Sequence, residues 1–273
     1  MTFFGNVSLR IFTLEWFLKG VLCTALLLGY SSCISAQEVS KDIEVNTHFW
    51  VSTNNVFQIT DRWAILNDIH VRRTDFVKNP SFYFLRFGAQ YRLREGHKLA
   101  GGYAHLWLER SDGNWDQFLN ENRIYQQYSI AHAFPKINFL FRVRNEQRFF
   151  NNVVNRESVG DTYMVNRFRL LLSLGVPFSE NSATQLIIAD EIHLNFGESI
   201  VYNTFNQNRF TIGIKHRISE MWSVDFGYMM VYQQFPSGVD YNLNHTLRLF
   251  FYGRFDLRRD ASKKLEYIQH GEE

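Results

Sequence analysis

Alternation of apolar and polar side chains with a period of two runs through the chain from residue 43 onward and strongly constrains its fold. The stretch NFLFRVRNEQRF at 138–149 shows it most clearly. Phe139, Phe141 and Val143 fall on one parity, and Arg142, Arg144, Glu146 and Arg148 fall on the other. Successive side chains of a β-strand point to opposite faces, so this period predicts strands with one apolar and one charged face. Helical spacing is not sustained anywhere in this region.

Similar segments recur along the chain and are separated by polar connections. Alternating segments lie at 63–73, 82–94, 121–134, 163–176, 185–196, 207–217, 222–235 and 242–255, and 97–109 is strand-like with less distinct faces. Short turns are predicted at 94–97, 134–136 and 219–221, and longer loops at 111–118, 151–162 and 197–205. Hairpins with short turns at one end and longer loops at the other are typical of up-and-down barrels in outer membranes.

Alternation alone does not say which face is inside. In a soluble sandwich the arginines would meet water, whereas in a membrane barrel the apolar face meets lipid. Three features favour the membrane: segments of about 10 to 14 residues, about eleven such segments, and aromatic residues near the segment ends. These aromatic residues are Trp50, Trp63, Trp107, Trp222, Tyr91, Phe134 and Phe178. We therefore expect residues 37–255 to form an all-β, antiparallel transmembrane β-barrel.

The number of strands depends on how segment 43–59 is divided. As one strand it would extend roughly 55 Å at about 3.3 Å per residue, which is too long for a bilayer. A hairpin at Asn54 and Asn55 would shorten it but would invert the apolar parity, which continues through Phe57 and Ile59. Because bacterial single-chain barrels have an even number of strands, we expect twelve strands, with ten as the alternative.

The first 36 residues have the features of a secretory signal peptide. A basic segment that includes Arg10 precedes the apolar run GVLCTALLLGY, which is shorter than the roughly 20 residues that a membrane-spanning helix needs. Small residues then end at Ala36. We expect cleavage after Ala36. Acylation at Cys33, as in a lipoprotein, is the alternative that we rank second.

The mature chain would contain no cysteine, because Cys23 and Cys33 both lie in the predicted signal peptide. This excludes a disulfide framework, a thiol nucleophile and a cysteine metal site. At the other end, residues 256–273 are expected to form a charged tail after the last strand. Lys plus Arg number 29 and Asp plus Glu number 27, so the global charge does not indicate a nucleic-acid partner.

In a membrane barrel the charged faces would line the lumen. The candidate lumen-lining residues are Glu121, Arg123, Arg142, Arg144, Glu146, Arg148, Arg167, Arg169, Glu191, His193, Arg209 and Arg248. An arginine-rich lumen favours small anionic solutes, in a narrow channel or in a binding barrel. The alternative is that Arg and Glu pair across neighbouring strands and close the lumen. The pattern does not separate these two interpretations.

Two other functional classes were weighed. An enzyme acting on lipid or lipopolysaccharide would need a nucleophile or base with an orienting partner, and only Glu191 and His193, with His70 and His105, offer candidates. We expect no enzyme, no metal and no cofactor, because no third ligand and no phosphate-binding or dinucleotide motif accompanies them. A structural barrel that presents its long loops to a partner is the other class.

Several blocks of sequence resemble the Domain of Unknown Function 2490 family. The blocks are NENR at 120–123, RVRNEQRF at 142–149, NRFRLLLSLGVPF at 166–178, DEIHLNFG at 190–197 and FNQNRFTIGI at 205–214. The resemblance implies a signal-directed β-barrel in the outer membrane of a Gram-negative bacterium, with outer-membrane lipids and the barrel assembly machinery as partners. It implies no reaction. One departure is that Phe255, the equivalent of the usual C-terminal aromatic residue, is followed by the charged tail.

Overall fold

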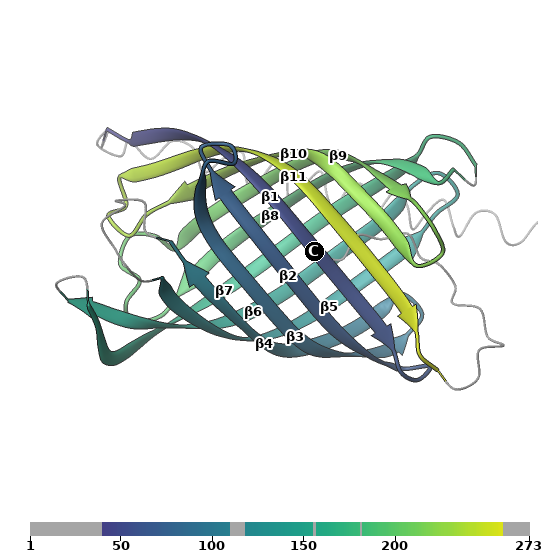
Figure 1. Cartoon of the computed structure of the whole chain (residues 1–273), viewed down its shortest axis with the longest axis horizontal. Helices are drawn as coiled ribbons and strands as arrows, with labels where there is room; N and C mark the ends of the chain where they lie inside the picture. The colour runs from purple at the N-terminus through teal and green to yellow at the C-terminus, as the bar shows by residue number, and fades with distance from the viewer. Residues whose placement is uncertain (1–39, 110–117, 155–156, 181, 259–273) are drawn as a thin grey trace, which may run out of the picture. The chain divides into compact units, whose positions relative to one another are not determined.

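The computed structural model describes residues 40–109, 118–154, 157–180 and 182–258, and these residues form strands, turns and loops without any helix (Figure 1). No helix that is long and apolar enough to cross a membrane occurs in these ranges. The strands are β1 (Asp42–Gln58), β2 (Trp63–Thr74), β3 (Asn79–Arg94), β4 (His97–Leu108), β5 (Leu119–Ala133), β6 (Asn138–Val154), β7 (Glu157–Pro177), β8 (Thr184–Phe196), β9 (Phe205–Arg217), β10 (Trp222–Gln234) and β11 (Asp240–Asp256). The predicted signal peptide and residues 259–273 of the predicted tail lie outside the described residues.

The described strands close into one barrel in sequence order, with β1 beside β11 (Figure 1). Consecutive strands pair antiparallel, whereas β1 and β11 pair in parallel from Asp42 opposite Asp240 to Gln58 opposite Asp256. The expected twelve strands, or ten, are therefore wrong for the described barrel, which has eleven. The even number rests on antiparallel closure, and an odd number closes only if the first and last strands run in the same direction.

Segment 43–59 is a single strand in the structure, because Asn54 and Asn55 do not turn the chain. Their side chains instead bond two residues back along the strand, where residue i and residue i−2 share a face. Asn54 Nδ2 donates to Ser52 Oγ at 2.9 Å inside the barrel, and Asn55 Nδ2 donates to Thr53 Oγ1 at 3.0 Å outside it. These bonds explain how two residues that favour turns are accommodated in a strand.

The connections between consecutive strands alternate between the two ends of the barrel. The β1–β2, β3–β4, β5–β6, β7–β8 and β9–β10 connections lie at one end, here called the turn end, and the others lie at the opposite end, the loop end. The predicted loop at 197–205 is confirmed, and loop 111–118 lies almost wholly outside the described residues. The predicted loop at 151–162 is wrong, because β6 and β7 continue to pair through it with an irregularity at Asn151 and Asn152.

Burial alternates along the strands and assigns their faces. Phe139, Phe141 and Val143 point outward on β6, while Arg142 and its neighbours of the same parity point inward and are buried. The apolar face is therefore outside, which is the reverse of a soluble sandwich. Trp50 departs from its expected place in an outer aromatic girdle. It shares the parity of the inward Ser52 and Asn54, and it is only 5% exposed.

Polar groups on the outer face are hydrogen-bonded to one another. Gln126, Asn145 and Gln147 form an amide cluster across β5 and β6, in which Gln126 Nε2 donates to Gln147 Oε1 at 3.1 Å. Asn208 Nδ2 likewise donates to both carboxylate oxygens of Asp190, at 3.0 and 3.1 Å. Such pairing reduces the cost of placing polar groups at an apolar surface.

Two facing glycines in the barrel wall accommodate an inward tyrosine and the close approach of two strands. Gly88 on β3 and Gly102 on β4 lie opposite each other, and a Cβ at Gly88 would clash with the Tyr125 hydroxyl. The ring of Tyr125 also lies 5.1 Å from the guanidinium carbon of Arg86 and 5.4 Å from that of Arg144. The absence of a Cβ at Gly88 therefore leaves room for an aromatic ring that contacts two inward arginines, and the absence of one at Gly102 lets β3 and β4 approach closely.

We predict that Gly102→Ala destabilises the barrel by about 1–3 kcal/mol, the usual cost of overpacking. The new Cβ would clash with the Phe87 carbonyl oxygen and lie 2.5 Å from Gly88 Cα, so the two strands would have to separate. The matched control is Gly101→Ala, because a Cβ at this adjacent position meets only the Tyr125 carbonyl oxygen, at 3.3 Å. Urea unfolding followed by heat-modifiable gel mobility measures both. Equal stabilities of the two variants would contradict the role of the glycine pair.

Candidate functional site

A network of ion pairs crosses the interior of strands β5 to β8. Glu146 lies at its centre, because its carboxylate accepts from Arg167 and from Arg169 Nη1, the latter at 2.9 Å. Arg123 and Arg144 approach the same carboxylate at 3.7 and 3.8 Å. All five residues have the parity that the alternating sequence assigns to the charged face.

Two further carboxylates extend the network in opposite directions. Glu191 on β8 accepts from Arg142 Nη2 at 2.7 Å and from Arg169 Nη2 at 2.8 Å, and Arg209 approaches it at 3.9 Å. Glu121 on β5 accepts from Arg123 and from Arg148 Nε, the latter at 2.6 Å. Three carboxylates thus bind seven guanidinium groups. Such charge-assisted bonds are strong because the groups are shielded from water.

The interior as a whole carries more positive than negative charge. Among the described residues, the buried acidic side chains are Asp68, Glu121, Glu146, Glu191 and Asp225, and the buried basic ones are Arg86, Arg123, Arg142, Arg144, Arg167, Arg169, Lys215 and Arg248. Arg248 Nη2 binds Asp225 Oδ2 at 2.5 Å, and Arg86 binds Asp68. The Lys215 ammonium lies 4.0 Å from the centre of the Tyr252 ring.

The twelve residues predicted from the sequence all lie on inward faces. Eleven of them belong to the network around Glu121, Glu146 and Glu191, and Arg248 forms its separate pair with Asp225. The side chains around Glu191 are shielded from solvent. Arg142 is only 1% exposed, and His193 is fully buried.

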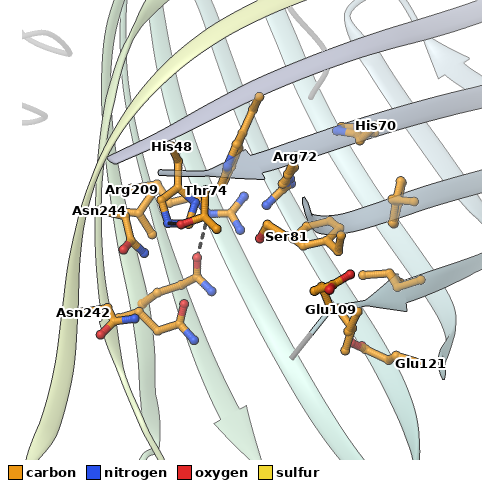
Figure 2. Close-up of a pocket in the computed structure, with 18 of the residues that line it drawn as sticks. His48, His70, Arg72, Thr74, Ser81, Glu109, Glu121, Arg209, Asn242 and Asn244 are labelled. Atoms are coloured by element: carbon orange, nitrogen blue, oxygen red, sulfur yellow. Dashed lines mark hydrogen bonds between the residues drawn. The ribbon is translucent and has the colours of Figure 1, made fainter. Parts of the chain in front are cut away.

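A cavity of about 560 Å³ opens inside the barrel toward the loop end. Eight arginines line it: Arg72, Arg86, Arg123, Arg144, Arg148, Arg167, Arg169 and Arg209. The lining carboxylates are Glu44, Glu109 and Glu121. Figure 2 shows His48, Arg72, Thr74 and Arg209 gathered on one side of this cavity, with Glu109 and Glu121 on another.

Arg72 occupies a different environment from the arginines of the network. Its guanidinium carbon lies 3.4 Å from the ring centre of Trp50 and 4.2 Å from that of Phe82. Among the described residues no carboxylate pairs with it, and its buried Nε has no hydrogen-bond partner. The alternation of β2 places Arg72 inward, but Trp50 appeared to belong to the outer girdle. Sequence reasoning therefore did not include Arg72 among the candidate site residues.

The histidines considered for catalysis do not come together. His193 Nε2 lies 3.0 Å from Glu191 Oε2, but the same carboxylate binds Arg142 and Arg169. His70 lines the cavity, whereas His105 points outward, where its Nδ1 lies 2.8 Å from Asn122 Oδ1. No group of three or more potential metal ligands occurs among the described residues.

We predict that Glu191→Gln destabilises the barrel by about 3–5 kcal/mol, because it leaves Arg142 and Arg169 with one fewer buried counter-charge. The matched control is Glu220→Gln, which removes the same charge from the exposed β9–β10 turn. Urea unfolding of both variants measures the difference. A loss below 1 kcal/mol for Glu191→Gln would show that the network contributes little to stability.

Comparison with known proteins places the chain in a family. A solved structure of the NanC porin is similar with a TM-score of 0.43 and 11% sequence identity, over 69% of this chain and 84% of that one. No curated protein matches the chain. The family described as "Protein of unknown function (DUF2490)" matches residues 47–242, a range that contains the whole arginine network. Because this match covers more than half of the chain, the protein belongs to the DUF2490 family.

Proposed function

We propose that this protein is an outer-membrane β-barrel that binds small anionic solutes in the cavity at its loop end. The observation that carries the proposal is the lining of that cavity, where eight arginines face three carboxylates. Positive charge that is removed from water is costly unless a counter-charge approaches it. A bound anion would supply that counter-charge.

The outer face supports a membrane location. Large apolar side chains are exposed on strands around the barrel, among them Phe87, Ile214 and Phe226, and the last of these is 54% exposed. A soluble monomer rarely exposes so extended an apolar surface, whereas a bilayer covers it. The closed sheet would also leave no strand edge unpaired in hydrocarbon.

The packing toward the turn end favours a binding barrel over an open channel. Arg142, Glu191 and His193 are nearly or fully buried at one level of the lumen, and their contacts with one another and with Arg169 hold them there. Passage of a hydrated ion would require several of these contacts to break at once. A solute that enters from the loop end would therefore stop at the network.

We predict that acetate and inorganic phosphate bind the refolded barrel, and that replacing both Arg72 and Arg209 with Gln weakens this binding at least tenfold. The reason is the loss of charge-assisted bonds, each contributing about 1.5–3 kcal/mol. The matched control is Arg94→Gln, which removes an exposed charge at the turn end of β3. Isothermal titration in lipid nanodiscs measures the affinities. Absence of binding by the parent protein, or equal binding by the double variant, would refute the proposal.

We further predict little or no ion conductance for the parent barrel in a planar bilayer. Correct insertion is checked by heat-modifiable gel mobility and by sedimentation with the outer-membrane fraction of the cells that produce it. Large, long-lived conductance steps with anion preference would show that the network opens, and the protein would then be a channel. Sedimentation with soluble proteins would remove the membrane part of the proposal.

A further inference from the structure

The cavity has two chemically different walls. Strands β5 to β7 contribute Arg123, Arg144, Arg148, Arg167 and Arg169, which make one wall cationic. Beside it, on β3, β4 and the start of β5, the lining contains the half-buried apolar side chains of Phe82, Leu108 and Leu119, and Phe235 follows β10. A cavity for inorganic ions would need only the first of these walls.

Members of two buried apolar clusters also line the cavity. One cluster contains Trp50, Met229, Val231 and Phe250, and the other contains Phe84, Ala104 and Leu106 packed against Phe82 and Leu108. All of these residues are on inward faces, and a third inward cluster, which contains Ala131, Leu140 and Leu171, lies outside the cavity lining. Apolar side chains that face a lumen need either burial or an apolar ligand, since the interior of a membrane barrel is normally polar.

Arg72 lies where the apolar wall meets the positive charge. Trp50 and Phe82 contact its guanidinium, and the Arg209 guanidinium carbon lies 5.2 Å from the centre of the same Trp50 ring. Aromatic rings contact the guanidinium group of Arg72. An oxyanion would therefore bind the N–H groups at the edge of this guanidinium. Trp50 Nε1, His48 Nδ1 and His70 Nδ1 are also buried and have no hydrogen-bond partner in the described part of the chain, and all three residues line the cavity.

We propose that the ligand of this cavity is a small amphiphilic organic anion, with a carboxylate, phosphate or sulfonate head at Arg72 and an apolar body against Phe82 and Leu108. This inference rests on the proposed function and names its substrate class. The cavity volume of about 560 Å³ suits such a ligand, since pockets for small organic molecules span roughly 300–1,000 Å³. A highly hydroxylated anion would leave the apolar wall without a matching partner.

The test compares ligands that differ in one property at a time, by isothermal titration against the refolded barrel in nanodiscs. Empty nanodiscs supply the correction for partition into lipid. The ligands are acetate, hexanoate, hexyl phosphate and hexylamine. Each methylene that becomes buried raises affinity about fourfold, so we expect hexanoate to bind at least tenfold more tightly than acetate. Hexylamine, which has the same body with the opposite charge, is expected not to bind. The relative affinities of hexanoate and hexyl phosphate identify the preferred head.

Two variants locate the apolar body. Leu108→Asn is expected to reduce the preference for hexanoate over acetate by at least threefold while acetate binding stays the same. The matched control, Leu99→Asn, changes the outward face of the same strand β4 and is expected to leave the preference unaltered. Both variants are first checked for heat-modifiable gel mobility. If Leu108→Asn does not fold, the chain-length comparison on the parent protein decides alone.

The outcomes separate this inference from the proposed function. Binding of acetate and hexanoate with equal affinity would overturn the amphiphilic ligand and leave the anion-binding barrel intact. Equal binding of hexylamine and hexanoate would overturn the role of Arg72 as the head-group site. Failure of all four ligands and of phosphate to bind would refute both proposals together.

Discussion

The parallel pairing of β1 with β11 is the contact on which the rest of the barrel depends. It extends over both strands completely, from Asp42 to Gln58, and it removes the last free edge of the sheet. Closure places one face of each alternating strand outside the barrel and the other face inside it. At the end of the seam, Phe57 and Phe255 stack with ring centres 5.0 Å apart, which adds side-chain contact to a pairing that is slightly weaker per residue than an antiparallel one.

Closure also forces the charged faces of many strands into one small volume. Seven guanidiniums there share three carboxylates, so each carboxylate joins two or more strands: Glu146 joins β6 to β5 and β7, and Glu191 joins β8 to β6, β7 and β9. The same network keeps the side chains around Glu191 buried, and more arginines than carboxylates line the cavity toward the loop end. The anion binding that we propose has its origin in the same shortage of acidic partners.

The apolar residues inside the barrel need a different physical explanation from the arginines. Met229, Val231 and Phe250 have the inward parity of β10 and β11, two strands that also carry the inward ion pair of Asp225 and Arg248. Their presence would be hard to explain in a uniformly wet pore. It becomes intelligible if the lumen holds an organic ligand, because the apolar wall and the cationic wall then recognise the two parts of one molecule.

The sequence by itself determined most of the strands, their two faces and the arginines of the network, because alternation is a local property that any register preserves. It also identified Glu191 and His193 as neighbours, since residues two apart on a strand share a face. Only the tertiary structure decided the number of strands, the straight course of β1 through Asn54, the continuation of β6 and β7 through 151–162, and the inward place of Trp50. It also decided which carboxylate meets which arginine and that Arg72 stacks on Trp50. These features depend on how distant strands are aligned around the closed barrel, and a pattern with a period of two is the same for many such alignments.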